Sequence, residues 1–224
     1  MKTFGRVLTA MITSFNEDGS VNIENSVAIA EHLLNHGSDG LVVCGTTGEN
    51  PTISRESKIA LFKAIAETCG DKGTIIANVG SNDTKGSVDF VKEVSTIPGI
   101  DGLLVVVPYY NKPNQQGQYL HFKSIAEVPG RVGTGIFPAT LARLHKEYPH
   151  ICAIKEASGN LMIASEIKRL MPGEDFMVYS GDDGLTLPML SVGACGVVSV
   201  VSHVAGKDMN AMIQAFEAGH NHEA

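Results

Sequence analysis

Short, nearly continuous runs of apolar residues alternate along the chain with longer segments in which apolar residues recur every three to four positions. The short runs predict strands buried on both faces, and the longer segments predict amphipathic helices. The predicted strands are 7–13, 40–44, 74–79, 103–107, 151–155, 177–180 and 196–200. The predicted helices are 23–35, 54–68, 85–95, 118–127, 138–146, 161–170, 185–192 and 206–218. Regular alternation of this kind implies a parallel sheet.

Two features favour a sheet that closes on itself. Seven strands and eight helices come close to the eightfold repeat of a TIM barrel. In addition, no strand is followed by a GxGxxG or GK(S/T) loop, which is the usual nucleotide-binding feature of an open, doubly wound sheet. We therefore predict an α/β protein of the TIM (β/α)8 type, with residues 1–224 forming one domain.

One strand is missing from this pattern. Between the predicted helices 118–127 and 138–146 there is only the segment 128–135, whose sequence is VPGRVGTG. Glycine and proline weaken or interrupt a buried strand. The sequence therefore predicts a barrel without its fifth strand.

Composition limits the classes of partner. The net charge is −7 at pH 7 and no basic stretch occurs, which argues against nucleic-acid binding. No apolar run approaches the ~18 residues of a membrane span, and the first apolar run is better explained as a strand than as a signal peptide. Three of the four cysteines, Cys44, Cys152 and Cys195, lie in or beside apolar runs, so we expect buried thiols and a cytoplasmic protein.

Lys155 is the most informative candidate for chemistry. It ends an apolar run, so a barrel would place its amine at the carboxyl end of a strand, where barrel enzymes carry their active sites. Desolvation lowers the pKa of a lysine, and a neutral amine can attack a ketone to form an imine. The alternative is a strand-end lysine that extends into solvent or pairs with Glu156.

The other strand ends carry weaker candidates. Thr46 and Thr47 offer hydroxyl and backbone donors to a carboxylate, although such a pair also suits an ordinary turn. A tyrosine at 109 or 110 could relay protons or could pack at an interface. Asp182 and Asp183 form either a carboxylate pair or a helix N-cap with an acid in the first turn.

Five strand-end motifs together resemble the dihydrodipicolinate synthase / N-acetylneuraminate lyase family of Schiff-base aldolases. They occur in the family's order and near its spacing, and the resemblance covers essentially the whole chain. The motifs are GTTGE at 45–49, PYYNKP at 108–113, IKEASG at 154–159, SGDD at 180–183 and GVVSV at 196–200.

The resemblance implies an imine between Lys155 and pyruvate, followed by addition of the resulting enamine to aspartate semialdehyde, in lysine (diaminopimelate) biosynthesis. It needs no metal and no organic cofactor, because the imine itself withdraws the electrons. It also implies a homo-oligomer, a dimer or a tetramer. The remaining roles that it implies are proton relay for Thr46 and, across a subunit interface, for Tyr110; substrate binding for Thr47, Arg131, Gly181 and Val198; and an interface or allosteric role for Tyr109 and Asn82.

The chain departs from the family in three places. The family carries a second relay tyrosine at the end of the fifth strand, and that strand end is absent here. The family's C-terminal helical region, which assists assembly, would follow the eighth helix, so we expect it to be missing. Where lysine-sensitive members have two histidines and a glutamate, this chain has Arg55, Lys58 and Gly86, which predicts weak inhibition by lysine.

Three functions remain open from the sequence. The first is the synthase reaction described above. The second is a sister aldolase acting on sialic acid or on another sugar-derived 2-oxo acid. The third is an inactive barrel, either a natural variant or an engineered fragment, because a barrel with an unpaired edge and one relay tyrosine fewer should have little activity.

Overall fold

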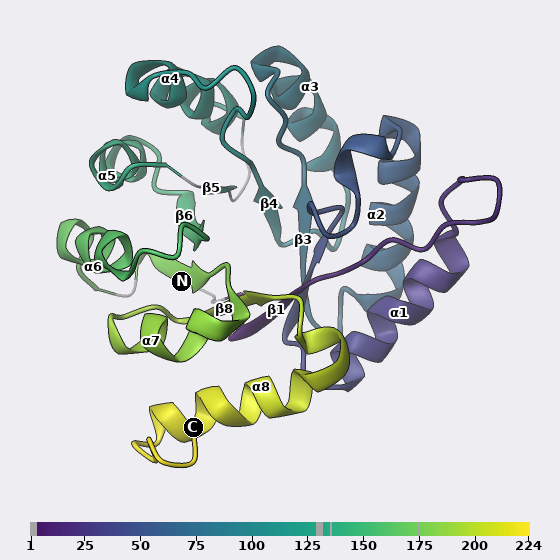
Figure 1. Ribbon diagram of the computed structural model, residues 1–224. Coiled ribbons are helices and arrows are strands. Elements are labelled where there is room, and N and C mark those ends of the chain that lie inside the picture. The colour runs from purple at the N-terminus through teal and green to yellow at the C-terminus, as the bar shows by residue number, and fades with distance from the viewer. Residues whose placement is uncertain (1–3, 129–131, 135, 174) are drawn as a thin grey trace.

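The computed structural model is a closed barrel of eight parallel strands in sequential order, with β8 pairing back to β1 (Figure 1). The structure describes residues 4–128, 132–134, 136–173 and 175–224. The strands are β1 (Val7–Ala10), β2 (Gly40–Val43), β3 (Thr74–Asn78), β4 (Gly102–Leu104), β5 (Val132–Thr134), β6 (Ile151–Glu156), β7 (Met177–Ser180) and β8 (Gly196–Ser199).

Helices form the outer ring around these strands (Figure 1). They are α1 (Ile23–Asn35), α2 (Arg55–Cys69), α3 (Thr84–Val94), α4 (Gln115–Ala126), α5 (Pro138–Glu147), α6 (Leu161–Leu170), α7 (Thr186–Ser191) and α8 (Ser202–Glu217). Two short 3-10 helices, η1 (Asn50–Thr52) and η2 (Asp183–Leu185), follow β2 and β7. None of the described helices is long and apolar enough to cross a membrane.

The predicted absence of the fifth strand is wrong. Val132 and Gly133 pair with Leu103 and Leu104 of β4, and β5 also pairs with β6, with a shift in register between Val132 and Gly133. A parallel ladder is made by backbone groups, so three residues suffice to bridge two neighbouring strands even when glycine is among them. The barrel therefore closes, and the predicted unpaired edge is not present.

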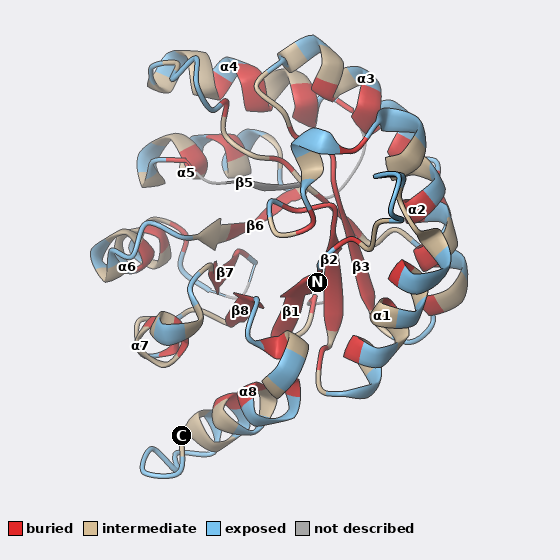
Figure 2. Ribbon diagram, turned by 45° about the vertical axis from the view of Figure 1, so that its right-hand side comes forward, coloured by how far each residue is buried: buried red, intermediate tan, exposed pale blue. Residues whose placement is uncertain are grey.

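The core has an outer and an inner layer. Apolar residues of the strands and of the inward helix faces fill the outer layer, and Figure 2 shows this as buried strands surrounded by helices whose inward faces are buried. The inner layer fills the barrel itself, where Phe4 from the N-terminal segment packs with Leu8, Ile76, Tyr179 and Val198. The inner layer fills the barrel interior and leaves the carboxyl ends of the strands available for a site.

The cysteines follow the prediction with one exception. Cys44 and Cys152 are buried as predicted, and so is Cys69, whereas Cys195 is only half-buried; none of these four cysteines forms a disulfide.

Candidate active site

A cavity of about 480 Å³ opens at the carboxyl ends of β2, β3, β4 and β6. Lys155, Thr46, Thr47, Asn78 and Tyr109 supply its polar groups, and backbone and aliphatic side chains of β4 and the loop after it supply much of the rest. The strand-end lysine and the two threonines that the sequence singled out thus meet in one cavity, as the convergence of parallel strand ends requires.

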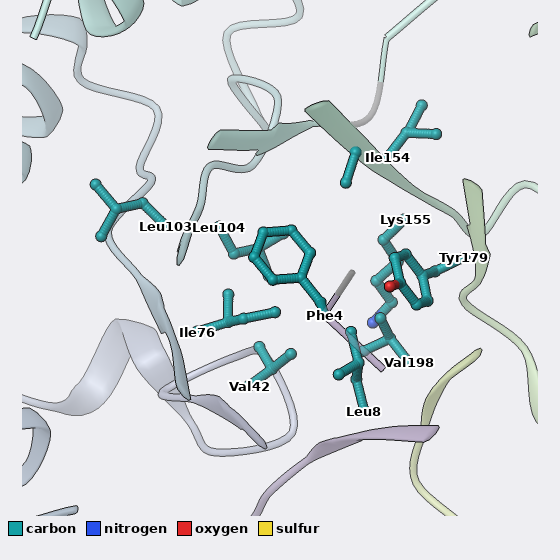
Figure 3. A pocket seen from close by; sticks show the side chains of 11 residues that line it. Phe4, Leu8, Val42, Ile76, Leu103, Leu104, Ile154, Lys155, Tyr179 and Val198 are labelled. Atoms are coloured by element: carbon teal, nitrogen blue, oxygen red, sulfur yellow. The ribbon is translucent and has the colours of Figure 1, made fainter. Parts of the chain in front are cut away.

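Lys155 reaches this cavity from the barrel interior. It lies opposite Tyr179 in the β6–β7 ladder, and its side chain also borders a small apolar hollow of about 30 Å³ (Figure 3). Among the described residues, none forms a hydrogen bond or an ion pair with its amine. Burial lowers the pKa of Lys155, and the carboxylate of Asp183 acts against this shift. An amine in this setting is neutral more often than an exposed lysine is.

Asp183 is a carboxylate whose place the sequence did not settle. One of its oxygens accepts from the backbone N–H groups of Val200 (3.0 Å) and Val201 (3.1 Å), and the other is buried without a partner among the described residues. The side chain of Asp182 instead accepts from the N–H of Gly184 (2.9 Å) and caps η2. The explanation as a helix N-cap with an acid in the first turn is therefore confirmed, with Asp182 as the cap and Asp183 in the first turn of η2. The charge of Asp183 also acts on Lys155, where it opposes the lowering of the pKa.

Gly181 makes room for the lysine. Its N–H donates to the Glu156 carbonyl (2.7 Å), which ties the ends of β6 and β7 together. A Cβ at this position would lie 2.5 Å from the Cβ of Ala157 and 3.0 Å from the Cε of Lys155. Any side chain here would therefore displace the Lys155 stem.

The threonine loop leaves β2 through a strained turn. Cys44 and Glu49, on either side of Thr46 and Thr47, have φ values of 55° and 58°. Such values are uncommon for residues other than glycine. They persist where the surrounding structure fixes the backbone, and they cluster at functional sites. The loop turns back through Gly48, whose N–H donates to the Gly45 carbonyl (3.1 Å).

Asn78 was missed by the sequence analysis. It ends β3 and is only 5% exposed, and its side-chain nitrogen donates to the Cys44 carbonyl (2.8 Å) while its side-chain oxygen has no partner among the described residues. The available signal was a polar residue next to the end of the apolar run 74–79. Asn78 joins β3 to the first residue of the strained turn.

The two loop tyrosines separate. Tyr109 lines the cavity and is 44% exposed, whereas Tyr110 is 92% exposed, has a φ of 66° and does not line the cavity of its own chain. Asn82 also lies away from the cavity, where its carbonyl accepts from the Asn111 side chain (3.0 Å). The buried Tyr179 is no substitute relay, because its hydroxyl donates to the Gly5 carbonyl (2.9 Å) and burial raises its pKa.

The last two predicted substrate-binding residues fall outside this cavity or outside the described residues. Val198 is buried in β8 and lines the small apolar hollow together with Lys155 (Figure 3). Arg131 lies outside the described residues, so the structure does not place it.

Comparison with known proteins identifies relatives of the whole described barrel. The sequence profile of the Dihydrodipicolinate synthetase family matches residues 3–224. A 4-hydroxy-tetrahydrodipicolinate synthase from Desulforamulus reducens is 50% identical over 226 residues, which include 96% of this chain and 76% of the relative. That stretch is longer than the 224 residues of the whole chain, so the relative contains residues within it that this chain lacks.

Solved structures agree with this result. The crystal structure of dihydrodipicolinate synthase from Bacillus anthracis has a TM-score of 0.95 and 42% sequence identity, and the match covers 100% of this chain and 79% of that one. The enzyme from Cyanidioschyzon merolae with lysine bound has a TM-score of 0.91 and 40% identity, with 95% of this chain and 75% of that one covered.

Proposed function

Because the chain belongs to the dihydrodipicolinate synthetase family, we propose that it condenses pyruvate with aspartate semialdehyde to give 4-hydroxy-tetrahydrodipicolinate. The observation that carries this proposal is the half-buried amine of Lys155, which has a lowered pKa and lines one cavity with Thr46 and Thr47. The reaction belongs to lysine (diaminopimelate) biosynthesis.

The reaction begins when the neutral Lys155 amine attacks the keto carbon of pyruvate. The carbinolamine loses water to give an imine, and loss of a methyl proton converts the imine into an enamine. The enamine carbon then bonds to the aldehyde carbon of aspartate semialdehyde, whose oxygen takes up a proton. Finally, the amino group of the second substrate attacks the imine carbon, which closes the ring and releases Lys155.

The surrounding groups divide the remaining work. Thr46 and Thr47 hold the pyruvate carboxylate through their hydroxyl and backbone donors, and Thr46 also passes protons to and from the intermediates. Gly181 and Val198 shape the space beside the imine. Arg131 receives the carboxylate of the second substrate. The residues in these roles supply the chemistry without a metal or an organic cofactor.

We propose that the chain acts as a homo-oligomer, because Tyr110 is 92% exposed and does not line the cavity of its own chain. In a dimer with twofold symmetry each Tyr110 reaches the partner's cavity and completes the proton relay there. Tyr109 and Asn82 lie on the loops that would meet at this interface. Cysteines that form no disulfide suit a reducing compartment, and we place the reaction in the cytoplasm.

Trapping with borohydride tests the proposal. Reduction of the pyruvate imine adds a stable group to one lysine, and peptide mass spectrometry should find it on Lys155 in the wild type and nowhere in Lys155→Ala. Consumption of aspartate semialdehyde, measured in parallel, separates the synthase from a sister aldolase that uses another aldehyde. Failure of pyruvate and borohydride to modify Lys155 would favour the inactive barrel.

A further inference from the structure

A second cavity, of about 380 Å³, also borders Lys155. It lies beside the first cavity, between the loop after β4, the first turns of α5 and α6, and the end of β6. Val107, Lys155 and Ala157 line both cavities, so Lys155 forms part of the wall that the two share. We call this second space the side cavity.

The lining of the side cavity is mainly apolar. Ile136, Phe137, Pro138 and Ile163 form one wall, and Phe137, 62% exposed, leaves its ring free at the rim. An exposed aromatic ring beside aliphatic side chains is suited to stacking against another flat apolar group.

The side cavity differs in charge from the first cavity, which Thr46 and Thr47 line. Among its described lining residues, Glu156 is the one acidic group and Lys155 the one basic group. The Glu156 carboxylate accepts from the Ser158 N–H (2.6 Å) and is held in place. A fixed carboxylate repels a second carboxylate at close range, so the side cavity favours an uncharged molecule.

We propose that the side cavity is an acceptor site for uncharged aldehydes with an apolar body, such as aromatic aldehydes, and that the pyruvate enamine on Lys155 adds to them. This inference rests on the proposed imine chemistry and extends it to another class of acceptor. Pyruvate occupies the first cavity, beside Thr46 and Thr47, and the aldehyde approaches Lys155 from the side cavity.

The reaction balances without any further reagent. The enamine carbon derived from the pyruvate methyl group forms a carbon–carbon bond to the aldehyde carbon, and the aldehyde oxygen takes up a proton to become a hydroxyl. Water then hydrolyses the imine, which frees Lys155 and releases a 4-hydroxy-2-oxo acid. The sum is one pyruvate and one aldehyde joined, with no oxidation or reduction.

Benzaldehyde is the probe that tests the proposal. The purified chain is incubated with pyruvate and benzaldehyde, and 4-hydroxy-2-oxo-4-phenylbutanoate is measured by mass spectrometry, with Lys155→Ala as the blank. The borohydride adduct of pyruvate is measured on the same preparation. A missing adduct overturns the proposed function, whereas a normal adduct without the phenyl product overturns the side-cavity inference alone.

Two tryptophan variants on α6 test the location. Ile163→Trp fills the side cavity and should lower formation of the phenyl product at least about tenfold. Met162→Trp is the matched control, because Met162 is 74% exposed and lines neither cavity, and it should keep the wild-type rate. Equal rates for Ile163→Trp and the wild type would overturn the assignment.

Loss of the pyruvate adduct in Ile163→Trp would reveal a folding defect in that variant. A third variant therefore tests the same site with a smaller change. Phe137→Ala removes only the exposed ring at the rim and should lower the phenyl-product rate about threefold to tenfold. An unchanged rate in Phe137→Ala would contradict the proposed stacking at the rim and with it the acceptor site.

Discussion

At the scale of single residues, the site depends on two opposing effects on the pKa of Lys155. Burial disfavours the ammonium, and among the described residues Asp183 is the group whose charge acts against that shift. The Asp183 carboxylate is itself held by two backbone N–H groups after β8. The charge that tunes the amine is therefore fixed by the barrel and not by a mobile side chain.

Replacing Asp183 by asparagine should lower the pKa of Lys155 further. The neutral amine then persists to lower pH, and the alkaline rise in the rate of imine formation moves toward acid. The measurement is the rate of borohydride-trapped pyruvate adduct across neutral and alkaline pH. Asp182→Asn, which changes only the cap of η2, is the matched control and should leave the profile in place. A shift toward alkaline pH in Asp183→Asn would contradict the electrostatic argument.

Gly181 offers a steric test of the same amine. Gly181→Ala places a methyl group 2.5 Å from the Cβ of Ala157 and 3.0 Å from the Cε of Lys155, so the lysine must move. Overpacking of this kind costs about 1–3 kcal/mol, and we expect a loss of roughly tenfold or more in the rate of imine formation. At Gly184, on the same loop, the nearest atom would be 3.5 Å from the added Cβ. Gly184→Ala should therefore retain most of the rate.

At the scale of elements, sequence pattern succeeds where the stabilising contacts are local. Helices 23–35 and 161–170 were predicted with the bounds they have in the structure, and each follows an asparagine whose side chain caps the first turn. The short strand β5 could not be predicted, because its pairing depends on β4 and β6, which are distant in sequence. Short-range periodicity carries no information about such partners.

The same distinction explains which site residues were found. Lys155, Thr46 and Thr47 were predictable because parallel strands bring their carboxyl ends together. Asn78 was missed because its bond to the Cys44 carbonyl arises only when β2 and β3 are neighbours. The positive φ and near-complete exposure of Tyr110 are properties of a folded loop that no local sequence signal specifies.

The α2–α3 pair supports a prediction about inhibition. Arg55 at the start of α2 forms an ion pair with Glu93 of α3 (2.7 Å), so part of the expected positive charge is already neutralised. Lys58, one turn further on, is half-buried, and burial lowers its pKa. This cation still disfavours a lysine ligand beside α2. Because of this charge, we expect millimolar lysine to change the condensation rate less than about twofold. Strong inhibition by lysine in steady-state assays would contradict this expectation.

At the scale of the whole molecule, the three residues of β5 are enough to close the barrel, and the strand ends that form the site therefore meet as they do in a complete barrel. Two residue pairs join β5 to β4, whereas four residue pairs join β2 to β3. The Desulforamulus relative carries additional residues within the matched region, and the described part of β5, Val132–Thr134, contains no tyrosine. The proposed proton relay therefore depends on Tyr110, which is 92% exposed and does not line the cavity of its own chain.

Subunit complementation tests whether Tyr110 works in a partner's site. Lys155→Ala lacks the nucleophile, and Tyr110→Phe lacks the relay hydroxyl, so each protein alone should be nearly inactive. When the two are co-expressed, random pairing makes about half of the dimers mixed, and each mixed dimer has one site with both groups. If Tyr110 reaches across a dimer, condensation activity should therefore return to about a quarter of the wild-type value. If Tyr110 serves its own chain, no mixed dimer contains an intact site, and co-expression should restore nothing.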